Sequence, residues 1–409
     1  MSPLPFTGVF AMQRSTGLSV FQPTTERLPM HAPILSFPNN QWFEDTFGFK
    51  EGTYEETQRT LLAMQASSSD PSRKLRWTTP PNESPIEVTF GSFVTPTVQE
   101  LRDECTRLRK NHASTDSEVK KISWQNVEGS VLDLLADPDN EGAVFQAASQ
   151  FNCLEFVHQN VIPEIGITKY CNDLTQGPAC AMVCGPGTAF RNYLVNMGNG
   201  DKGQREESQI NTLQPIMDKL TECNNGSSTH LHVKNGYALV GEKEMRDLHK
   251  LIHSHQDELT GLLQVGIQRD TEVTYPTLTG RLVTQVYCSA VPVSYSSASA
   301  DAWQPLARLV LRGSYEATLL EGVRLHLLKQ QQSPNTTIPP TKVFLTLVGG
   351  GVFGNDMHWI YGAMEYAHRS ATAYGVPLDI RIVHYRNTPF EAEKFVKRIY
   401  SKQARRTDY

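Results

Sequence analysis

Hydrophobic and polar residues follow two different periods along the last third of the chain. Apolar runs at 282–295, 342–348 and 377–385 have the length and β-branched content of buried strands. Residues 303–329 and 358–373 instead repeat apolar positions every three to four residues, as amphipathic helices do, and a short helix, FEAEKFVKRIYSK, follows the last strand. Strand and helix alternate, which predicts crossover connections and a largely parallel sheet.

The same kinds of pattern occur upstream. IEVTFGSF from residue 86 and GAVFQAAS at 142–149 predict strands, and 95–112 predicts a helix capped by Thr95 or Thr97. Helices are also predicted within 188–197, 210–220 and 242–263, with Pro215 starting or bending the second. VKNGYALV predicts a hairpin, because Asn235-Gly236 lies between apolar residues.

The first 80 residues differ in composition from the rest of the chain. They are rich in Pro, Ser, Thr and Asn and contain one helical pattern at 54–66. We therefore expect an irregular N-terminal arm at 1–85. A single α/β domain at 86–409 should follow it, with a mixed, largely parallel sheet flanked by helices and with helical insertions around 196–275.

Composition narrows the functional classes. The 38 Lys and Arg residues against 43 Asp and Glu give a net charge of −5 without long single-sign runs, which argues against nucleic acid as a partner. The seven cysteines are irregularly spaced without a CxxC pair, so neither a disulfide framework nor a zinc site is predicted. No long apolar stretch or signal-like N-terminus occurs, so we expect a soluble cytoplasmic protein without a membrane partner.

The most informative local sequence is LVGGGVFGND at 347–356, which lies between a predicted strand and a predicted helix. Glycines let backbone N–H groups approach an anion, and the following helix N-terminus adds a favourable dipole. The GK[ST] of a P-loop is absent. Gly349, Gly351 and Gly354 have the spacing GxGxxG, but no acidic residue ends a following strand about 20 residues later, so a dinucleotide-binding site is not predicted. A tight turn without a ligand is the other interpretation. The candidate phosphate-binding residues are Gly349, Gly350, Gly351, Val352, Phe353, Gly354 and Asn355.

Four segments occur in an order that resembles a macrodomain, the α/β fold that binds ADP-ribose. They are GAVFQAASQFN, QVYCSAVPVSY, LVLRGSYEATLLEGVRLHLLK and KVFLTLVGGGVFGN. QFNCLEF and GITKYCNDLTQGPACA are most similar to the MavL-type ADP-ribosylhydrolases, which remove ADP-ribose from arginine and are known for acting on ADP-ribosylated ubiquitin. The chain departs from the family at Gln146 and Ser149, where macrodomains generally have Asn.

The resemblance implies a macrodomain-like fold, binding of ADP-ribose, and an ADP-ribosylated protein as partner, with ubiquitin as one candidate. No cofactor and no metal are expected. Hydrolysis of a ribosyl bond passes through an oxocarbenium-like transition state, which requires carboxylates near the ribose. Asp173 and Glu155 fall in loops that carry the acidic catalytic residues of the MavL-type branch, and they are the candidate catalytic pair.

Three further residues are candidates for the distal ribose. Asn152 lies in the loop with Glu155, and Thr175 and Gln176 follow Asp173, where they could equally form a helix N-cap and its neighbour. Asp356 is expected to cap a helix. Phe353 could pack on a ribose or in the core.

Two other functions remain open from the sequence. One is a module that binds ADP-ribose without cleaving it, which would not need the carboxylate pair. The other is a phosphatase or nucleotide-processing enzyme, which would need acid and base groups beside a phosphate.

Overall fold

The centre of the molecule is an eight-stranded sheet in the order β1-β5-β14-β13-β6-β12-β11-β4. The computed structural model describes residues 26–27, 35–78, 84–110, 122–198, 200–334 and 336–407, with side chains described from residue 35 to residue 402. The strands are, in sheet order, β1 (Glu26–Arg27), β5 (Ser123–Glu128), β14 (Leu378–His384), β13 (Thr341–Leu345), β6 (Val144–Ala148), β12 (Leu282–Cys288), β11 (Gly266–Glu272) and β4 (Ser92–Val94). The first six pair in parallel, whereas β11 is antiparallel to both neighbours.

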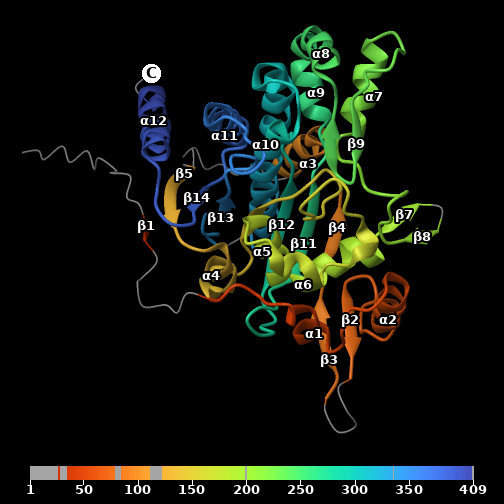
Figure 1. Ribbon diagram of the computed structural model, residues 1–409. Coiled ribbons are helices and arrows are strands. Elements are labelled where there is room, and N and C mark those ends of the chain that lie inside the picture. The colour runs from red at the N-terminus through yellow and green to blue at the C-terminus, as the bar shows by residue number, and fades with distance from the viewer. Residues whose placement is uncertain are drawn as a thin grey trace, which may run out of the picture.

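Helices cover both faces of the sheet (Figure 1). One face carries α3 (Val98–Lys110), α10 (Ala300–Gln332), α11 (Met357–Thr372) and α12 (Phe390–Thr407). The opposite face carries α4 (Val131–Ala136), α5 (Gln176–Val183) and α6 (Gly185–Ala189). Strand residues alternate between these two cores: Val144 packs with α10 and α11, and Phe145 packs with α4 and α5. The predicted α/β fold with a mixed, largely parallel sheet flanked by helices is confirmed.

Several predicted elements have shorter bounds than their sequence patterns. The strand predicted from residue 86 is two strands, β3 (Ile86–Thr89) and β4, because Gly91 turns the chain with φ +76° where a Cβ would lie 1.9 Å from the Arg269 carbonyl oxygen. β12 ends at Cys288, since Pro292 leads into the turn η5 (Val293–Tyr295). The helix predicted over 242–263 is α8 (Glu242–Ser254) and α9 (Gln256–Leu262), which are separated at His255.

Other local signals are borne out. Thr97 caps α3, because its hydroxyl accepts from the Glu100 N–H and its own N–H donates to the Glu100 carboxylate. Pro215 lies in the first turn of α7 (Gln214–Cys223). The hairpin forms between β9 (His232–Lys234) and β10 (Tyr237–Leu239), with Asn235 and Gly236 at positive φ. The helix predicted within 188–197 is the end of α6 and a π-helical turn, η4 (Phe190–Leu194), which precedes the small hairpin of β7 (Asn196–Gly198) and β8 (Asp201–Lys202).

The described part of the expected irregular arm, residues 35–78, is instead an ordered layer. It contains α1 (Trp42–Phe47), α2 (Tyr54–Ala66) and β2 (Lys74–Trp77), which pairs with β3. Aromatic residues stabilise this layer: Trp42, Phe43 and Phe47 are buried in a core shared with Tyr170 and Tyr193. α1 has only six residues, fewer than two helical turns, so the sequence does not repeat its apolar positions often enough to predict a helix. Residues 1–25 and 28–34 lie outside the described part, and the division at residue 85 stays a prediction.

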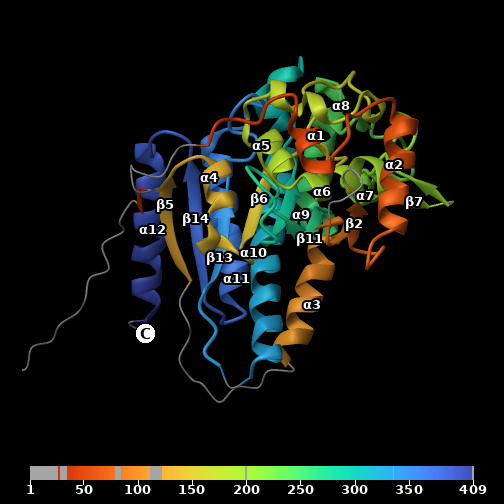
Figure 2. The same cartoon turned by 90° about the horizontal axis from the view of Figure 1, so that it is seen from below.

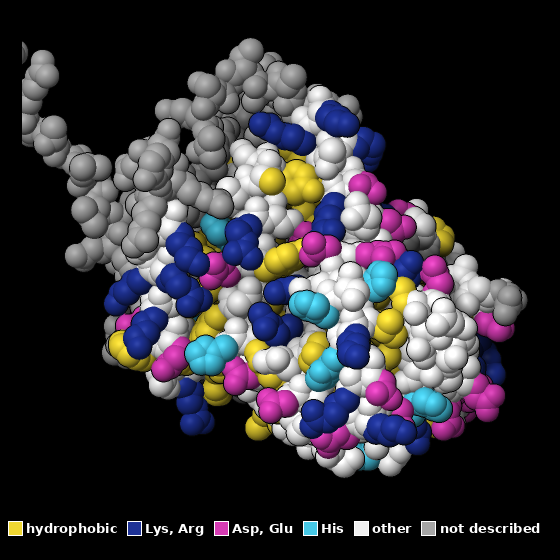
Figure 3. Space-filling model, turned by 90° about the horizontal axis from the view of Figure 1, so that it is seen from above, with side chains coloured by type: hydrophobic (Ala, Val, Ile, Leu, Met, Phe, Trp, Pro, Cys, Tyr) yellow, Lys and Arg dark blue, Asp and Glu magenta, His cyan; other side chains and the backbone are white. Residues whose placement is uncertain are grey.

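The remaining surface is mixed in charge. Figure 3 shows the molecule from above, with Lys and Arg side chains lying among Asp and Glu side chains. Two buried carboxylates are paired with arginines: Glu316 and Glu321 of α10 lie 2.7 and 2.9 Å from Arg102 and Arg269. Within the described residues, no helix is both long enough and apolar enough to cross a membrane.

Candidate functional site

The candidate residues gather at the edge of the sheet where the parallel strands end. The loops that follow β6, β12 and β13 leave this edge side by side, because these strands pair in parallel. Figure 2 shows α4, α5 and α1 near this edge. In open α/β sheets, the carboxyl ends of the strands are where ligands bind.

The glycine loop follows β13 at this edge, and α10 fixes its base. The buried Tyr315 hydroxyl donates to the Thr346 carbonyl at 2.7 Å and accepts from the Val348 N–H at 3.1 Å. Gln146 on β6 accepts from the Thr346 N–H at 3.3 Å and donates to Thr318 on α10. The glutamine that departs from the macrodomain pattern therefore has a structural role between two strands and a helix.

Two glycines in the loop are required by its shape. Gly349 has φ +73°, and a Cβ there would lie 2.4 Å from the Ala290 Cβ. Gly354 has φ +70°, and a Cβ there would lie 2.1 Å from the Ser294 Oγ. Non-glycine residues rarely adopt such backbone angles. Gly351 differs, because the space where its Cβ would be is open.

The tip of the loop presents unused backbone donors beside a helix start. No acceptor for the N–H groups of Gly351, Val352 and Phe353 occurs among the described residues. α11 begins at Met357, and Asp356 caps it by accepting from the His358 N–H at 2.6 Å. Free N–H groups and a helix N-terminus both favour an anion, and binding of a phosphate by this loop stays a prediction.

Asn355 closes the loop from inside. It is only 4% exposed, its side-chain amide donates to the Val291 carbonyl at 2.8 Å and to the Gly349 carbonyl at 3.4 Å, and its own N–H donates to Gly349. These bonds occupy the donors that the sequence suggested for a phosphate. Asn355 thus holds the turn closed.

Phe353 packs in an aromatic cluster at the same edge. Its ring centroid lies 5.6 Å from that of Tyr237 and 5.7 Å from that of Tyr295. Tyr237 comes from the hairpin β9-β10, and its hydroxyl donates to the Phe156 carbonyl at 2.8 Å. The cluster joins loops that follow β6, β12 and β13 to the hairpin. Tyr295 is 46% exposed, so one side of the cluster faces solvent.

Asp173 lies within electrostatic range of this cluster. Burial raises the pKa of the Tyr237 hydroxyl, and Tyr295 and the carboxylate of Asp173 raise it further. Asp173 follows the 3-10 helix η3 (Thr168–Asn172), and one of its carboxylate oxygens accepts from the Thr175 N–H at 2.9 Å. Asp173 is half-buried, and although it comes from a separate segment its carboxylate acts electrostatically on Tyr237.

Thr175 and Gln176 lie at the start of α5. Thr175 is exposed, and no side-chain hydrogen bond marks it as the helix cap. Gln176 is bonded to the end of β6: its amide oxygen accepts from the Ala148 N–H and its amide nitrogen donates to the Gln146 carbonyl, both at 2.8 Å. Gln176 therefore fixes α5 to the sheet, and Thr175 remains available to a ligand.

Glu155, the second candidate carboxylate, is buried beneath the start of α5. It is 2% exposed, and its two carboxylate oxygens lie 3.4 and 3.5 Å from Nη2 of Arg191. A Cβ on Gly177 would lie 3.3 Å from the Glu155 Cγ, which shows how closely the helix covers it. Arg191 is itself fully buried, and its guanidinium lies 3.6 Å from the centroid of the Tyr287 ring.

Burial raises the pKa of Glu155 to about 7, against the opposing effect of Arg191. Because the folded-state pKa exceeds the unfolded one, the native state binds the proton more tightly between these values. The stabilisation from this proton is present at low pH and is lost as pH rises through about 7.

We therefore expect a pH-dependent difference in stability between wild type and Glu155→Gln. As pH rises from 5 to 7, the free energy of unfolding of wild type should fall relative to the variant by about 2 to 3 kcal/mol. Urea denaturation at closely spaced pH values measures this difference. Burial lowers the pKa of His384 to about 4, but His384 is present in both proteins, so its contribution cancels in the difference. Glu87→Gln is the control, because backbone and side-chain hydrogen bonds lower the pKa of Glu87 to about 2, and parallel curves for Glu155→Gln would contradict the expectation.

Asn152 is also buried. It is 0% exposed, its side-chain amide donates to Gln209 at 2.8 Å, and its side-chain oxygen accepts from the Leu154 N–H at 3.1 Å. Gln209 in turn donates to Asn235 of the hairpin. Asn152 therefore ties the β6 loop to the hairpin that carries Tyr237.

Sequence reasoning missed Tyr237, Tyr295, Tyr170 and Arg191. Tyr237 follows the predicted turn Asn235-Gly236, but nothing local places that hairpin beside the glycine loop. Tyr170 is buried, and its hydroxyl accepts from the Glu155 N–H at 3.0 Å. Arg191 lies in a segment of helical pattern, where a charged residue is expected at the surface.

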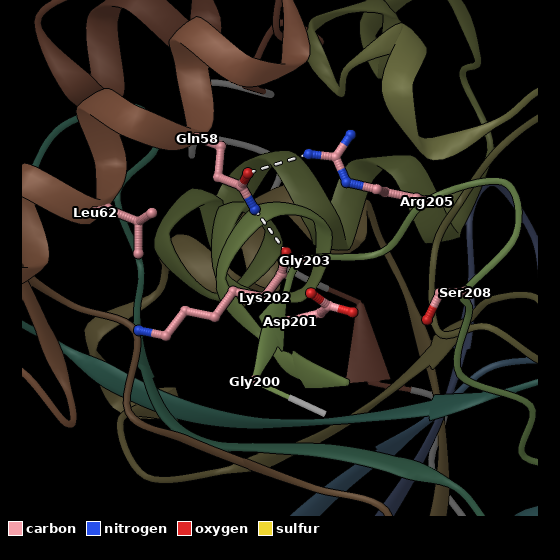
Figure 4. A pocket seen from close by; sticks show the side chains of 8 residues that line it. All are labelled: Gln58, Leu62, Gly200, Asp201, Lys202, Gly203, Arg205 and Ser208. Atoms are coloured by element: carbon pink, nitrogen blue, oxygen red, sulfur yellow. Dashed lines mark hydrogen bonds between the residues drawn. The ribbon is translucent and has the colours of Figure 1, made fainter. Parts of the chain in front are cut away.

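Two surface hollows lie away from these residues. The first, of about 410 Å³, lies between α2 and the β7-β8 hairpin (Figure 4). The second, of about 670 Å³, lies beside β10 and the start of α8. Neither hollow is lined by the glycine loop or by Asp173. The candidate site is therefore defined by the glycine loop, Asp173 and the aromatic cluster, and by neither hollow. In the part of the chain that the structure describes, no group of three or more His, Cys, Asp or Glu residues could hold a metal ion.

One family model matches part of the chain. It is the glyoxalase/bleomycin resistance protein/dioxygenase superfamily, over residues 39–143. This segment is less than half of the chain, and it does not form a unit in the structure. Its strand β4 pairs with β11 at one end of the sheet, while β5 pairs with β14 near the other. No curated protein is significantly similar in sequence.

Similar solved structures are poly(ADP-ribose) glycohydrolases. That of Deinococcus radiodurans in complex with ADP-ribose is 10% identical, covers 76% of this chain and 94% of its own, and gives a TM-score of 0.35. That of Thermomonospora curvata is 12% identical, covers 84% and 99%, and also gives 0.35. Similarity at this level is too distant to assign an activity. The similarity to poly(ADP-ribose) glycohydrolases does not extend to specificity for arginine. The arginine-specific activity that the sequence resemblance implies therefore remains a proposal.

Proposed function

We propose that the chain is an ADP-ribosylhydrolase that removes mono-ADP-ribose from a modified protein by hydrolysing the ribosyl bond, with arginine as the modified residue. The observation that supports the proposal is that the carboxylate of Asp173 acts electrostatically on Tyr237, whose ring packs against Phe353 of a glycine loop with free N–H groups. The ribosyl bond to be hydrolysed belongs to the ribose attached to the diphosphate. Its hydrolysis therefore requires a carboxylate near a loop that binds the diphosphate.

In this proposal the glycine loop binds the diphosphate. The N–H groups of Gly351, Val352 and Phe353 donate to phosphate oxygens, and the start of α11 adds its dipole. Tyr315 and Asn355 hold the loop in this shape before a ligand arrives. A rigid loop loses little conformational freedom on binding, which favours affinity.

The distal ribose then lies toward Asp173. The free oxygen of its carboxylate can accept a proton from the attacking water and stabilise positive charge on the anomeric carbon. The C–N bond to the guanidine breaks as the water oxygen bonds to that carbon. The proton that Asp173 accepted from water passes to the leaving guanidine, so one water is added across the C–N bond, Asp173 is again a carboxylate, and the products are ADP-ribose and arginine. Thr175 is placed to bond a ribose hydroxyl.

The two candidate carboxylates have different roles in this proposal. Glu155 is covered by α5 and bonded to Arg191, so it does not reach a ribose held at the surface. Asp173 carries the direct chemistry. Glu155 acts on it indirectly, since the N–H of Glu155 bonds Tyr170, whose carbonyl accepts from the Asp173 N–H at 3.1 Å.

Arginine is the favoured leaving residue, because a carboxylate binds a guanidinium through strong, directional hydrogen bonds. Ubiquitin as the protein carrier rests on the sequence resemblance. The test is a panel of substrates with ADP-ribose on arginine, serine or glutamate, including arginine-modified ubiquitin, with free ADP-ribose measured by mass spectrometry. We expect release from the arginine-linked substrates, and release only from the serine- or glutamate-linked ones would contradict the proposed linkage.

The second candidate is a module that binds ADP-ribose without cleaving it. The burial of Glu155 favours it, because only one of the two carboxylates is open to solvent. Calorimetry with ADP-ribose beside the substrate panel separates the two functions. Binding without release from any substrate would support the binding module.

A further inference from the structure

Glu51 connects the N-terminal layer to the segment that carries Asp173. It lies between α1 and α2, outside the sheet. One carboxylate oxygen accepts from the Ile167 N–H and the other from the Thr168 N–H, both at 2.8 Å. The first oxygen also accepts from the Tyr193 hydroxyl at 2.5 Å. One side chain thus binds the two backbone donors at the start of η3.

The local backbone is shaped for this carboxylate. Gly166 has φ +84°, and a Cβ there would lie 2.6 Å from one carboxylate oxygen of Glu51. Only glycine lets the chain pass so close to the carboxylate at this backbone angle. The Trp42 indole N–H adds a second bond from the layer, at 2.9 Å to the Thr168 carbonyl.

The segment between Glu51 and Asp173 is short. η3 runs from Thr168 to Asn172, so Asp173 follows the anchored residues by a single 3-10 helix. Its far end is fixed by Gln176, which bonds β6. Within this frame, the anchor at Thr168 sets where η3 begins and therefore where Asp173 points.

We propose that Glu51 is a positioning residue for Asp173, through which the N-terminal layer sets the geometry of the catalytic segment. The kinetic part of this proposal rests on the hydrolase function proposed above. Because the glycine loop has its own anchors, loss of Glu51 should disturb the chemistry and leave diphosphate binding intact.

The test compares Glu51→Ala, Glu51→Gln and the control Glu55→Ala in the full chain. Glu55 lies in the same layer, but its carboxylate pairs with Arg205 at the surface and does not contact η3. We expect Glu51→Ala to lower kcat on arginine-linked substrate by about 10- to 100-fold, because small displacements of a reacting group carry such costs. The affinity for ADP-ribose should be unchanged, and Glu55→Ala should resemble wild type.

Glu51→Gln keeps one acceptor oxygen, so its kcat should lie between those of wild type and Glu51→Ala. If Glu51→Ala does not fold, the kcat of Glu51→Gln tests the proposal. A wild-type kcat in a folded Glu51→Ala would overturn the proposal. So would an equal loss of kcat and of ADP-ribose affinity, since this indicates general damage to the fold.

Hydrogen exchange provides a readout that does not depend on activity. In Glu51→Ala, amides of residues 166–176 should exchange at least about tenfold faster, as expected when a half-buried side chain that accepts from two backbone N–H groups is lost. Amides of the glycine loop should be unchanged. If wild type releases no ADP-ribose, the proposed function fails while this measurement still tests the anchor, and unchanged exchange at 166–176 would overturn the anchor itself.

Discussion

Asp173→Asn should slow the release of ADP-ribose from an arginine-linked substrate by about 1,000-fold, within the range that general acid-base groups contribute. Asparagine keeps an oxygen that can accept from the Thr175 N–H, so the turn before α5 should survive. Only the charge and the proton-accepting oxygen are removed. The affinity for ADP-ribose should change little, because the diphosphate is bound elsewhere.

Single-turnover kinetics and calorimetry measure the two effects of Asp173→Asn separately. Asp201→Asn is the matched control, since Asp201 is an exposed aspartate beside the hollow between α2 and β8. A rate within a factor of a few of wild type would exclude Asp173 from the chemistry. The carboxylate would then have to come from a residue outside the 173–176 segment.

Gly349→Ala should weaken ADP-ribose binding by about 100-fold, more than an ordinary loss of one hydrogen bond. The methyl group would meet Ala290 at 2.4 Å, and the backbone would be strained at φ +73°. Such strain costs about 1 to 3 kcal/mol, and relief requires the loop to move. Since Asn355 bonds the Gly349 carbonyl, the displacement should open the whole turn.

Calorimetry with ADP-ribose tests Gly349→Ala, with Gly362→Ala as the control. Gly362 lies in α11 next to open space, so its alanine variant should bind as wild type. Thermal denaturation of both variants shows whether each is folded. If a folded Gly349→Ala binds ADP-ribose with wild-type affinity, the glycine loop does not bind the diphosphate.

The fold class could be predicted because the period of apolar residues is a local property of the sequence, and it shows strands and helices alternating along the chain. Leu378, Ile380 and Ile382 alternate along β14 as a half-buried strand requires, and α10 repeats its apolar positions over 33 residues. The N-terminal layer was not predicted, because α1 is short and is stabilised by aromatic contacts with distant residues. Only α2 had a local signal, its capping box of Thr53 and Glu56.

The site was predicted unevenly for the same reason. The glycine loop is a local strand-loop-helix pattern, and the structure has it between β13 and α11, while its binding of a phosphate stays a prediction. The burial of Glu155 and Asn152 depends on α5 and on the hairpin, which lie elsewhere in the sequence. Tyr237 could not be placed beside Phe353 without the hairpin's position. Asp173 stays a prediction until its variant is measured.

The most direct test of the proposed hydrolase is cleavage of arginine-ADP-ribosylated protein in water enriched in oxygen-18, followed by mass spectrometry of the products. If water attacks the anomeric carbon, free ADP-ribose should carry one heavy oxygen on its distal ribose, and the released protein should carry none. Asp173→Asn should yield almost no labelled product. Label on a phosphate would instead indicate a phosphatase, and ADP-ribose binding without any labelled product would contradict hydrolysis.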